Sequence, residues 1–412
     1  LPYGGWVAPK IFFLGTAGVV RFRGLRIAGM SGIFNERHFS LGRFERPPYN
    51  AETLRSVYHC RALDAFRLQC LRRPAKGPAL DVFVSHDWPA GISMFGDHHR
   101  LLQRKKFLRE EVYSGSLGSP AGRQLLQTLR PRYWFAAHLH VKFAAVVEHR
   151  QQEVVVEEQA PRRAGQDGGD GGNEASEATK EDCEPELTRF LALDKCLRQR
   201  DFLQLLHIDS PVRKSEDDDA SLRQQKASNT QVDATESQAM EAEESEETSP
   251  GLCYDLEWLA VLRKTWSLET GARENTRLPA AEAFEVSDGD IEQIRAAMTA
   301  AIPPEDRGHS AEDDIRIPQN FEKTATPDEE AGDRRDVGLG PLRLLPNPQT
   351  DFLLNALELP HIITVPCDGE GRVQVKHGKQ APSGTGHNGA ADDSEARKAG
   401  EAQESTGDHD EN

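Results

Sequence analysis

The run Ala79-Leu-Asp-Val-Phe-Val-Ser-His-Asp87 is a short apolar block that ends in a polar triplet. Its length and its content of Val and Phe are typical of a strand buried inside a sheet. Before it, residues 51–72 have helical spacing, and Pro74 ends that pattern. After it, residues 119–129 form a predicted helix, with Ser as N-cap and Pro at the first helical position.

Strand patterns also lie further out on both sides of this block. Residues 10–15 and 18–29 indicate short strands, and Arg23-Gly24 predicts a tight turn within the second stretch. Residues 133–140 and 141–147 predict two short strands around a His-x-His corner. Strand, helix, strand, helix, strand is an α/β arrangement.

Charge divides the chain into two parts. The 412 residues carry 28% charged and 37% hydrophobic positions and a net charge of −17. Residues 1–150 hold 23 Lys and Arg against 10 Asp and Glu, whereas residues 151–412 hold 27 against 57. The acidic average therefore hides a basic domain, and the low apolar content predicts that part of the chain is unpacked.

Several classes of protein are excluded. No apolar stretch approaches the roughly 18–20 residues that span a bilayer, and the N-terminus lacks a signal peptide, so we expect an intracellular soluble protein with no membrane partner. The chain opens with Leu and not Met, which suggests a fragment. The six scattered cysteines predict reduced thiols, not a disulfide framework or a zinc ribbon: Cys60, Cys70, Cys183, Cys196, Cys253 and Cys367.

Composition predicts four regions. Residues 1–150 form an α/β domain, and residues 151–185, rich in Gly, Glu, Asp and Ser, form a disordered linker. Residues 186–358 form a small, mostly helical module interrupted by disordered acidic insertions, and residues 359–412 form a disordered acidic tail. The module contains three apolar islands, which we expect to dock together because none is long enough to be stable alone.

Three histidines stand at the ends of predicted strands: His86, His138 and His140. In an open α/β sheet, ligands collect at the loops that leave the carboxyl ends of the strands. Neutral imidazole is the commonest transition-metal ligand, and two histidines around one residue can address two neighbouring metals. The alternative is that all three are ordinary loop histidines, because an isolated His-x-His is a weak signal.

The basic half also suggests a polyanionic ligand. It has a net charge of +13, and its basic residues alternate with Tyr and Phe. Residues 31–50 form a loop rich in both charged and aromatic side chains. Lys and Arg neutralise phosphates while aromatic rings stack on unpaired bases. A merely basic surface is the alternative. The stretch from about Leu101 to Val112 is predicted to be basic and helical, and the preceding His98-His99 pair to be solvated.

Motifs along the whole chain resemble those of the RNA lariat debranching enzymes. In the first half these are Leu1-Pro-Tyr-Gly-Gly-Trp, Ile27-Ala-Gly-Met-Ser-Gly-Ile-Phe, Pro47-Pro-Tyr-Asn, Ser85-His-Asp-Trp-Pro, Leu117-Gly-Ser-Pro-Ala and Ala137-His-Leu-His-Val-Lys-Phe-Ala-Ala. In the second half they are Phe190-Leu-Ala-Leu-Asp-Lys-Cys-Leu, Arg200-Asp-Phe-Leu-Gln, Tyr254-Asp-Leu-Glu-Trp-Leu and Asn347-Pro-Gln-Thr. Their order matches the family's order, and the match is almost continuous over residues 1–150.

The resemblance implies the C-terminal part of a calcineurin-like metallophosphoesterase sandwich. In that family a dinuclear centre, with two divalent ions that Fe, Zn or Mn would suit, hydrolyses the 2′–5′ phosphodiester at the branch point of excised introns. By motif, His86 and His138 ligate one metal and His140 the other. The resemblance also places the lariat-recognition loop at residues 31–50. The RNA contacts expected in and next to that loop are Arg43, Tyr49 and Arg55.

The sequence also departs from the family. The family's Cys/His ligands, its bridging Asp after a Gly and its Gly-Asn-His-Glu segment with the general-acid His are not among the 412 residues. No catalytic acid is therefore assigned in this chain. We expect the chain alone to be inactive and poorly folded, and a full-length product to debranch lariats.

The resemblance further implies intron lariat RNA and splicing-related proteins as partners, in the nucleus. Two alternatives stay open. One is a non-catalytic RNA-binding or interaction protein derived from the family. The other is a metallophosphatase fragment of another specificity, against which the loop at residues 31–50 argues.

Overall fold

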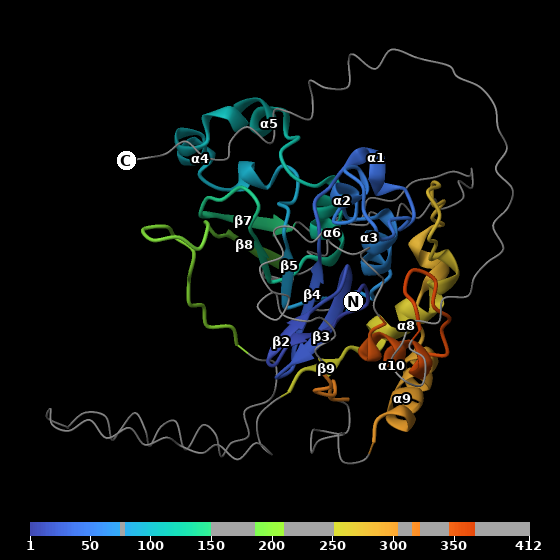
Figure 1. Cartoon of the computed structure of the whole chain (residues 1–412). Helices are drawn as coiled ribbons and strands as arrows, with labels where there is room; N and C mark the ends of the chain where they lie inside the picture. The colour runs from blue at the N-terminus through green and yellow to red at the C-terminus, as the bar shows by residue number, and fades with distance from the viewer. Residues whose placement is uncertain (75–78, 150–185, 210–250, 304–314, 322–345, 367–412) are drawn as a thin grey trace, which may run out of the picture. The chain divides into compact units, whose positions relative to one another are not determined.

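A seven-stranded mixed sheet organises the computed structural model, which describes residues 1–74, 79–149, 186–209, 251–303, 315–321 and 346–366. The strand order is β7-β8-β6-β5-β4-β3-β9, and β1 and β2 form a separate two-stranded sheet (Figure 1). The strands are β1 Gly5–Ala8, β2 Ile11–Phe13, β3 Ala17–Phe22, β4 Leu25–Met30, β5 Val82–Ser85, β6 Tyr133–Ala136, β7 Phe143–His149, β8 Glu186–Ala192 and β9 Cys253–Tyr254.

Four central strands of the large sheet are parallel. β4 pairs with β5, β5 with β6, and β6 with β8, all in the same direction, while β7, β3 and β9 join in antiparallel fashion. The carboxyl ends of β4, β5, β6 and β8 therefore lie along one edge of the sheet. The mixed α/β arrangement that the sequence predicts is confirmed, and it is consistent with a metallophosphoesterase-like fold.

The turn between β3 and β4 has the geometry that its sequence predicts. Arg23 and Gly24 both have positive φ, 49° and 76°, and Phe22 pairs with Leu25 across the turn. Two consecutive positive φ values give the twist that matches a two-residue hairpin. The pairing runs from this turn back to Ala17 opposite Met30, so β3 and β4 are paired along their whole length.

The main core lies between one face of the sheet and two helices, α3 (Ala62–Gln69) and α6 (Pro120–Leu129). Phe83 of β5 and Trp134 of β6 are fully buried and stack with their ring centroids 4.1 Å apart. Ser119 caps α6 by accepting a hydrogen bond from the Gly122 amide at 3.1 Å, which confirms the predicted helix start. The apolar residues of α6 face this core.

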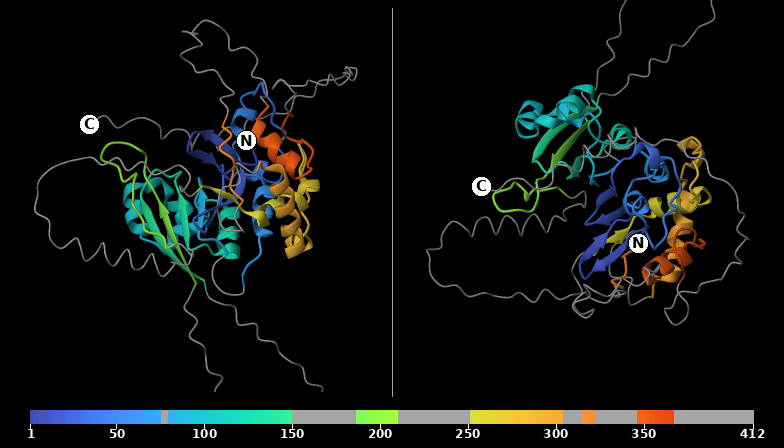
Figure 2. Two further views of the ribbon diagram at one scale, coloured as in Figure 1. Left: turned by 90° about the horizontal axis from the view of Figure 1, so that it is seen from below. Right: turned by 45° about the horizontal axis from the view of Figure 1, so that its top comes forward.

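Three helices from the second half of the chain pack together: α8 (Leu256–Lys264), α9 (Asp288–Ala301) and α10 (Pro348–Ala356). They gather beside α3 and the β9 end of the sheet (Figures 1 and 2). Gln349 of α10 ties them to the N-terminal segment, because it accepts a hydrogen bond from the Trp6 amide at 2.6 Å and donates one to the Trp6 carbonyl at 2.9 Å.

A buried carboxylate joins α8 to the sheet. Asp255 caps α8 by accepting a hydrogen bond from the Trp258 amide, and its side chain is fully buried. The same carboxylate accepts hydrogen bonds from Arg26 of β4 at 2.8 Å and from Arg21 of β3 at 3.1 Å. The attraction of these guanidinium groups outweighs burial and lowers the pKa of Asp255.

Two expectations from the sequence are wrong. The first of the three apolar islands, residues 187–206, does not begin as part of a helical module: its first residues belong to β8, which lies between β6 and β7 in the sheet. The pattern over residues 51–72 is not one helix but two, α2 (Thr53–Ser56) and α3. The break between them exists because His59 leaves the helical path and forms a bridge with Ile33.

The remaining short elements are α1 (Glu36–Phe39), α4 (His98–Arg104), α5 (Arg109–Ser114), η1 (Ile92–Phe95), η2 (Lys106–Leu108), η4 (Trp266–Leu268) and η5 (Ala281–Phe284). The predicted linker, the acidic insertions and almost all of the predicted tail lie outside the described residues. Within the described ranges, no helix is long and apolar enough to cross a membrane. Among those same residues the cysteines form no disulfide: Cys60, Cys70, Cys196 and Cys253.

Candidate functional site

The three predicted metal-ligating histidines stand at the carboxyl edge of the parallel strands. His86 directly follows β5, while His138 and His140 follow β6, the neighbouring strand. The rings of His86 and His138 meet with their centroids 5.1 Å apart and their planes at 84°. The sheet therefore brings together two imidazoles that are 52 positions apart in the sequence.

Two buried indoles hold these histidines in place. The Trp134 indole donates a hydrogen bond to Ser85 Oγ at 2.9 Å, immediately before His86. The Trp88 indole donates one to the Ala137 carbonyl at 2.8 Å, immediately before His138. Both indoles are fully buried, so each histidine projects from a strand end that the core has already fixed.

The His-x-His corner has an unusual backbone. His138 and His140 have φ values of 57° and 50°, in the left-handed region that residues other than glycine rarely adopt. Such conformations cost about 1–3 kcal/mol and cluster at functional sites, where surrounding structure enforces them. This corner is accordingly the most constrained part of the edge.

Burial favours the neutral form of two of the three imidazoles, those of His86 and His140. Burial lowers the pKa of His86, and the adjacent His138 lowers it further against the opposing effect of Asp87. Burial also lowers the pKa of His140, followed by the ammonium groups of Lys195 and Lys105. A neutral imidazole is the form that binds a metal.

The imidazole nitrogens are of a type that binds transition metals, but too few of them come together to complete a metal site. In the described part of the chain, no three His, Cys, Asp or Glu side chains gather closely enough to hold a metal ion. His86 and His138 are brought together, whereas His140 does not join them in a three-ligand set. The described residues thus offer part of a metal site, and the metal assignment stays a prediction.

One acidic residue of the edge was missed by the sequence analysis. Asp87 accepts a hydrogen bond from the Phe34 amide at 3.1 Å and another from the Trp88 amide at 3.0 Å. It therefore fixes the start of the loop at residues 31–50 next to His86. Its position in the sequence, directly after a histidine at a strand end, was the only feature that could have predicted this role.

The three predicted RNA contacts have different surroundings. Arg43 is mostly buried, with its guanidinium paired to Asp64 of α3 and its amide bonded to the Thr270 carbonyl. Tyr49 is half-buried, and Arg55 is exposed on α2. Arg43 thus has a structural role of its own in fixing the loop to α3, and all three assignments to RNA stay predictions.

A histidine pair closes the same loop. His38 Nδ1 and His59 Nδ1 are 2.8 Å apart, so one ring donates a hydrogen bond and the other accepts it. Burial lowers the pKa of both rings, to about 4 for His59, where the proximity of His38 and of Arg61 adds to the effect. Both rings are therefore neutral at pH 7, and protonating both would break the pair.

We expect this pair to make the protein sensitive to mild acid. Unfolded histidine titrates near 6.5 and folded His59 near 4, so the unfolded state takes up the proton first. The stabilising contribution is complete above about pH 6.5 and is lost as the pH falls toward 4. The melting temperature should therefore fall less between pH 7.5 and pH 5 in His59→Gln than in the unsubstituted chain.

His149 shares this pH window, since burial lowers its pKa to about 4, so the variant should retain part of the dependence. The exposed His207 supplies the control substitution, His207→Gln, which should leave the pH dependence unchanged. Equal acid sensitivity in His59→Gln and in the unsubstituted chain would contradict this role of the pair.

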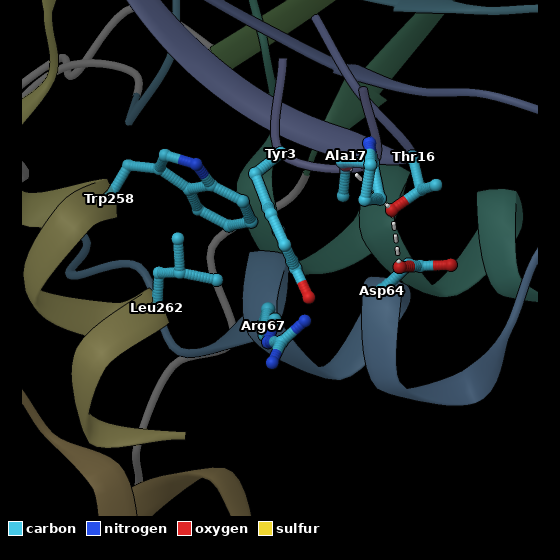
Figure 3. Close-up of a pocket in the computed structure, with 8 residues that line it drawn as sticks. Tyr3, Thr16, Ala17, Asp64, Arg67, Trp258 and Leu262 are labelled. Carbon is cyan, nitrogen blue, oxygen red and sulfur yellow. Dashed lines mark hydrogen bonds between the residues drawn. The ribbon is translucent and has the colours of Figure 1, made fainter. Parts of the chain in front are cut away.

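A small pocket lies in the described region away from the histidines, where the N-terminal segment meets α3 and α8. It is lined by Tyr3, Asp64, Arg67, Trp258 and their neighbours, and Thr16 donates a hydrogen bond to Asp64 at 2.9 Å (Figure 3). Burial raises the pKa of Tyr3, so its hydroxyl stays protonated. No predicted site histidine lines this pocket, which belongs to the packing between the two halves of the chain.

Comparison with known proteins gives consistent matches. The family model described as "Lariat debranching enzyme, C-terminal domain" matches residues 185–362. The chain is 36% identical over 332 residues to the lariat debranching enzyme of Homo sapiens, covering 79% of this chain and 46% of the relative. For the Danio rerio enzyme the identity is 38% over 327 residues, covering 79% and 44%, and for the Drosophila melanogaster enzyme it is 34% over 394 residues, covering 89% and 65%.

The mixed sheet with histidines at its carboxyl edge defines the class, an α/β protein consistent with the metallophosphoesterases. Within that class, the chain is similar to the lariat debranching enzymes over 79–89% of its length in these three comparisons. The chain spans about half the length of most of the curated relatives it matches.

Proposed function

We propose that this chain serves RNA lariat debranching, the hydrolysis of the 2′–5′ phosphodiester at the branch point of excised introns. The observation that carries the proposal is the meeting of His86 and His138 at the edge where the parallel strands end. The similarity of the chain to lariat debranching enzymes supplies the choice of reaction. On this proposal the catalytic domain has the calcineurin-like sandwich fold.

Divalent metal ions would be the cofactors, two per complete site, and Fe, Zn or Mn suits the imidazole donors. When bound, a metal pair would supply an acidified water and offset charge on the phosphoryl oxygens. His86 and His138 would hold one ion and His140 the other. The chain's own contribution is to fix the strand ends before His86 and His138 through the indoles of Trp134 and Trp88, and to lower the pKa of His86 and His140 by burial.

The loop at residues 31–50 would receive the branched RNA. Asp87 anchors its start, and Arg43 anchors its middle to α3, so the loop is held beside the histidines. Exposed Arg55 and half-buried Tyr49 are the side chains we propose for direct contact with RNA. Intron lariat RNA and splicing-related proteins would be the partners, and the nucleus the location.

A second function rests on a different observation. The described residues bring together two imidazoles and no third metal ligand. A protein of this family that binds branched RNA without hydrolysing it would need no complete metal centre. Metal-independent binding of branched RNA, with no cleavage under any condition, would favour this reading.

The test compares two proteins on a branched RNA. One is the 412-residue chain, and the other is a complemented chain, in which the chain follows the segment of a family relative that carries the Cys/His, Gly-Asp and Gly-Asn-His-Glu motifs. We expect the complemented chain to cleave the branch, and the 412-residue chain alone to be at least about 100-fold slower because its described residues offer only part of a metal site. A complemented chain that folds and binds metal but does not cleave the branch would contradict the proposed function.

A further inference from the structure

A surface rich in exposed basic and aromatic side chains lies between η1 and α5. Its apolar members are exposed to unusual degrees for large hydrophobic residues: Phe107 63%, Tyr113 56%, Phe95 52% and Met94 49%. Its basic members are Arg100, Arg104, Lys105, Lys106 and Arg109. These nine residues are called the basic–aromatic surface below.

No carboxylate of the described residues neutralises the basic side chains of this surface. Within the described residues, none of the five forms an ion pair with a carboxylate. By contrast, the buried Arg61 and Arg67 pair with Glu45 and Glu269. The acidic residues of the same stretch are Asp97, which caps α4, and Glu110 and Glu111 in the first turn of α5, so basic residues outnumber acidic ones by five to three. Positive charge is therefore left for an external anion.

Core packing does not account for the exposed rings. The segment is anchored from beneath by buried Leu101, Leu102, Leu108 and Val112, which are at most 5% exposed. Gly96 forms a bridge with Ala145 of β7, and a side chain there would lie 2.3 Å from the Ala144 carbonyl. The rings thus stand outward on a rigid base, and large apolar groups left exposed in this way mark interaction sites.

The surface adjoins the candidate site. β7, which carries the bridge to Gly96, begins three residues after His140. Lys105 is close enough to act electrostatically on the His140 ring, and its ammonium also lies 6.0 Å from the Phe107 ring centroid. Figure 1 shows α4 and α5 together at one end of β7 and β8, and the right view of Figure 2 agrees.

We propose that the basic–aromatic surface binds single-stranded RNA, with phosphates on its Lys and Arg side chains and bases stacked on Phe95, Phe107 and Tyr113. This rests on the proposed function, since it assigns the strands that leave the branch point to this surface. An acidic protein would match the charge but would not need three exposed rings. Unpaired bases match both features, because every base has a face that stacks on an aromatic ring.

The test is fluorescence anisotropy of a labelled 12-nucleotide oligouridine with the 412-residue chain. Base stacking contributes about 1–3 kcal/mol per base, so Phe107→Ala and Phe95→Ala should each raise the Kd by about 5-fold or more. The double variant Lys105→Gln with Lys106→Gln removes two phosphate contacts. It should lower the slope of log K against log salt by about 1.4.

Matched controls come from the two-stranded sheet. Phe13 on β2 is 39% exposed, and Lys10 lies in the adjacent turn, so Phe13→Ala and Lys10→Gln should leave the Kd and the slope unchanged. All variants should retain the melting temperature of the unsubstituted chain because the substituted side chains are exposed, apart from Lys105, which is half-buried. If Phe107→Ala lowers the melting temperature, Phe107→Leu takes its place. Leucine keeps the apolar volume but has no ring to stack on a base.

The aromatic variants binding oligouridine as tightly as the unsubstituted chain would overturn the proposal. Tighter binding to phosphatidylserine vesicles than to oligouridine, lost in Phe107→Ala, would also overturn it and assign the surface to membranes. The result differs if the proposed function is wrong. In that case the complemented chain will not cleave the branched RNA, but Phe107→Ala will still weaken its binding to oligouridine. If this inference alone is wrong, the complemented chain will cleave the branch, but the substitutions on the basic–aromatic surface will not change its affinity for oligouridine.

Discussion

Asp255→Ala is expected to lower the free energy of unfolding by about 3–5 kcal/mol, which is the cost of removing one partner from a buried ion pair. Asp255 is fully buried, whereas Arg26 is 13% exposed and would be left without its main counter-charge. The substitution also removes the N-cap of α8. Urea denaturation of the purified chain measures the effect.

Two variants separate the parts of this prediction. Asp255→Asn keeps a capping oxygen and the side-chain shape, so its loss reports mainly the charge. Asp288→Ala removes an exposed carboxylate that pairs with Arg72 at 2.6 Å, and it should cost no more than about 1 kcal/mol. A loss below about 1 kcal/mol for Asp255→Ala would contradict the view that this ion pair joins α8 to the sheet.

The same carboxylate predicts a pH dependence in strong acid. The folded pKa of Asp255 lies below its unfolded value, so its contribution is present above the unfolded pKa of about 3.9. It is lost as the pH falls through the lower, folded pKa. The stability difference between the unsubstituted chain and Asp255→Asn should therefore shrink in that range.

His138→Ala is expected to remove at least one metal ion from the complemented chain. His138 lies against His86 and is held by a corner with a left-handed backbone, so no neighbouring described side chain can take its place. Elemental analysis of the purified protein measures the metal-to-chain ratio, which should fall from about two. His207→Ala, at an exposed position, should leave the ratio unchanged. An unchanged ratio in His138→Ala would remove this histidine from the metal site.

Local signals made part of the fold predictable. The β3–β4 turn was identified because Arg23-Gly24 suits two positive φ values, and the start of α6 because Ser119-Pro120 is a strong capping pair. The meeting of His86 and His138 was also predictable, since neighbouring parallel strands end at the same edge. In each case a few adjacent residues, or one topological rule, contained the information.

Other features depend on distant partners and were missed. The apolar run that forms β8 is equally compatible with a helix, and only its pairing with β6 and β7 decides between them. Asp255 finds Arg26 across 229 positions, and Asp87 finds the Phe34 amide across 53. Nothing in the sequence near Arg43 indicated that its guanidinium pairs with Asp64.

The most direct measurement of the central claim is the cleavage rate of a branched RNA that contains one 2′–5′ and several 3′–5′ linkages. The complemented chain should break only the 2′–5′ bond, and His138→Ala should slow that step by at least about 100-fold, beyond the 10–100-fold typical of residues that merely support a metal ligand. Cleavage that proceeds at the same rate in His138→Ala, or that falls on the 3′–5′ bonds, would contradict the assignment of this edge to lariat debranching.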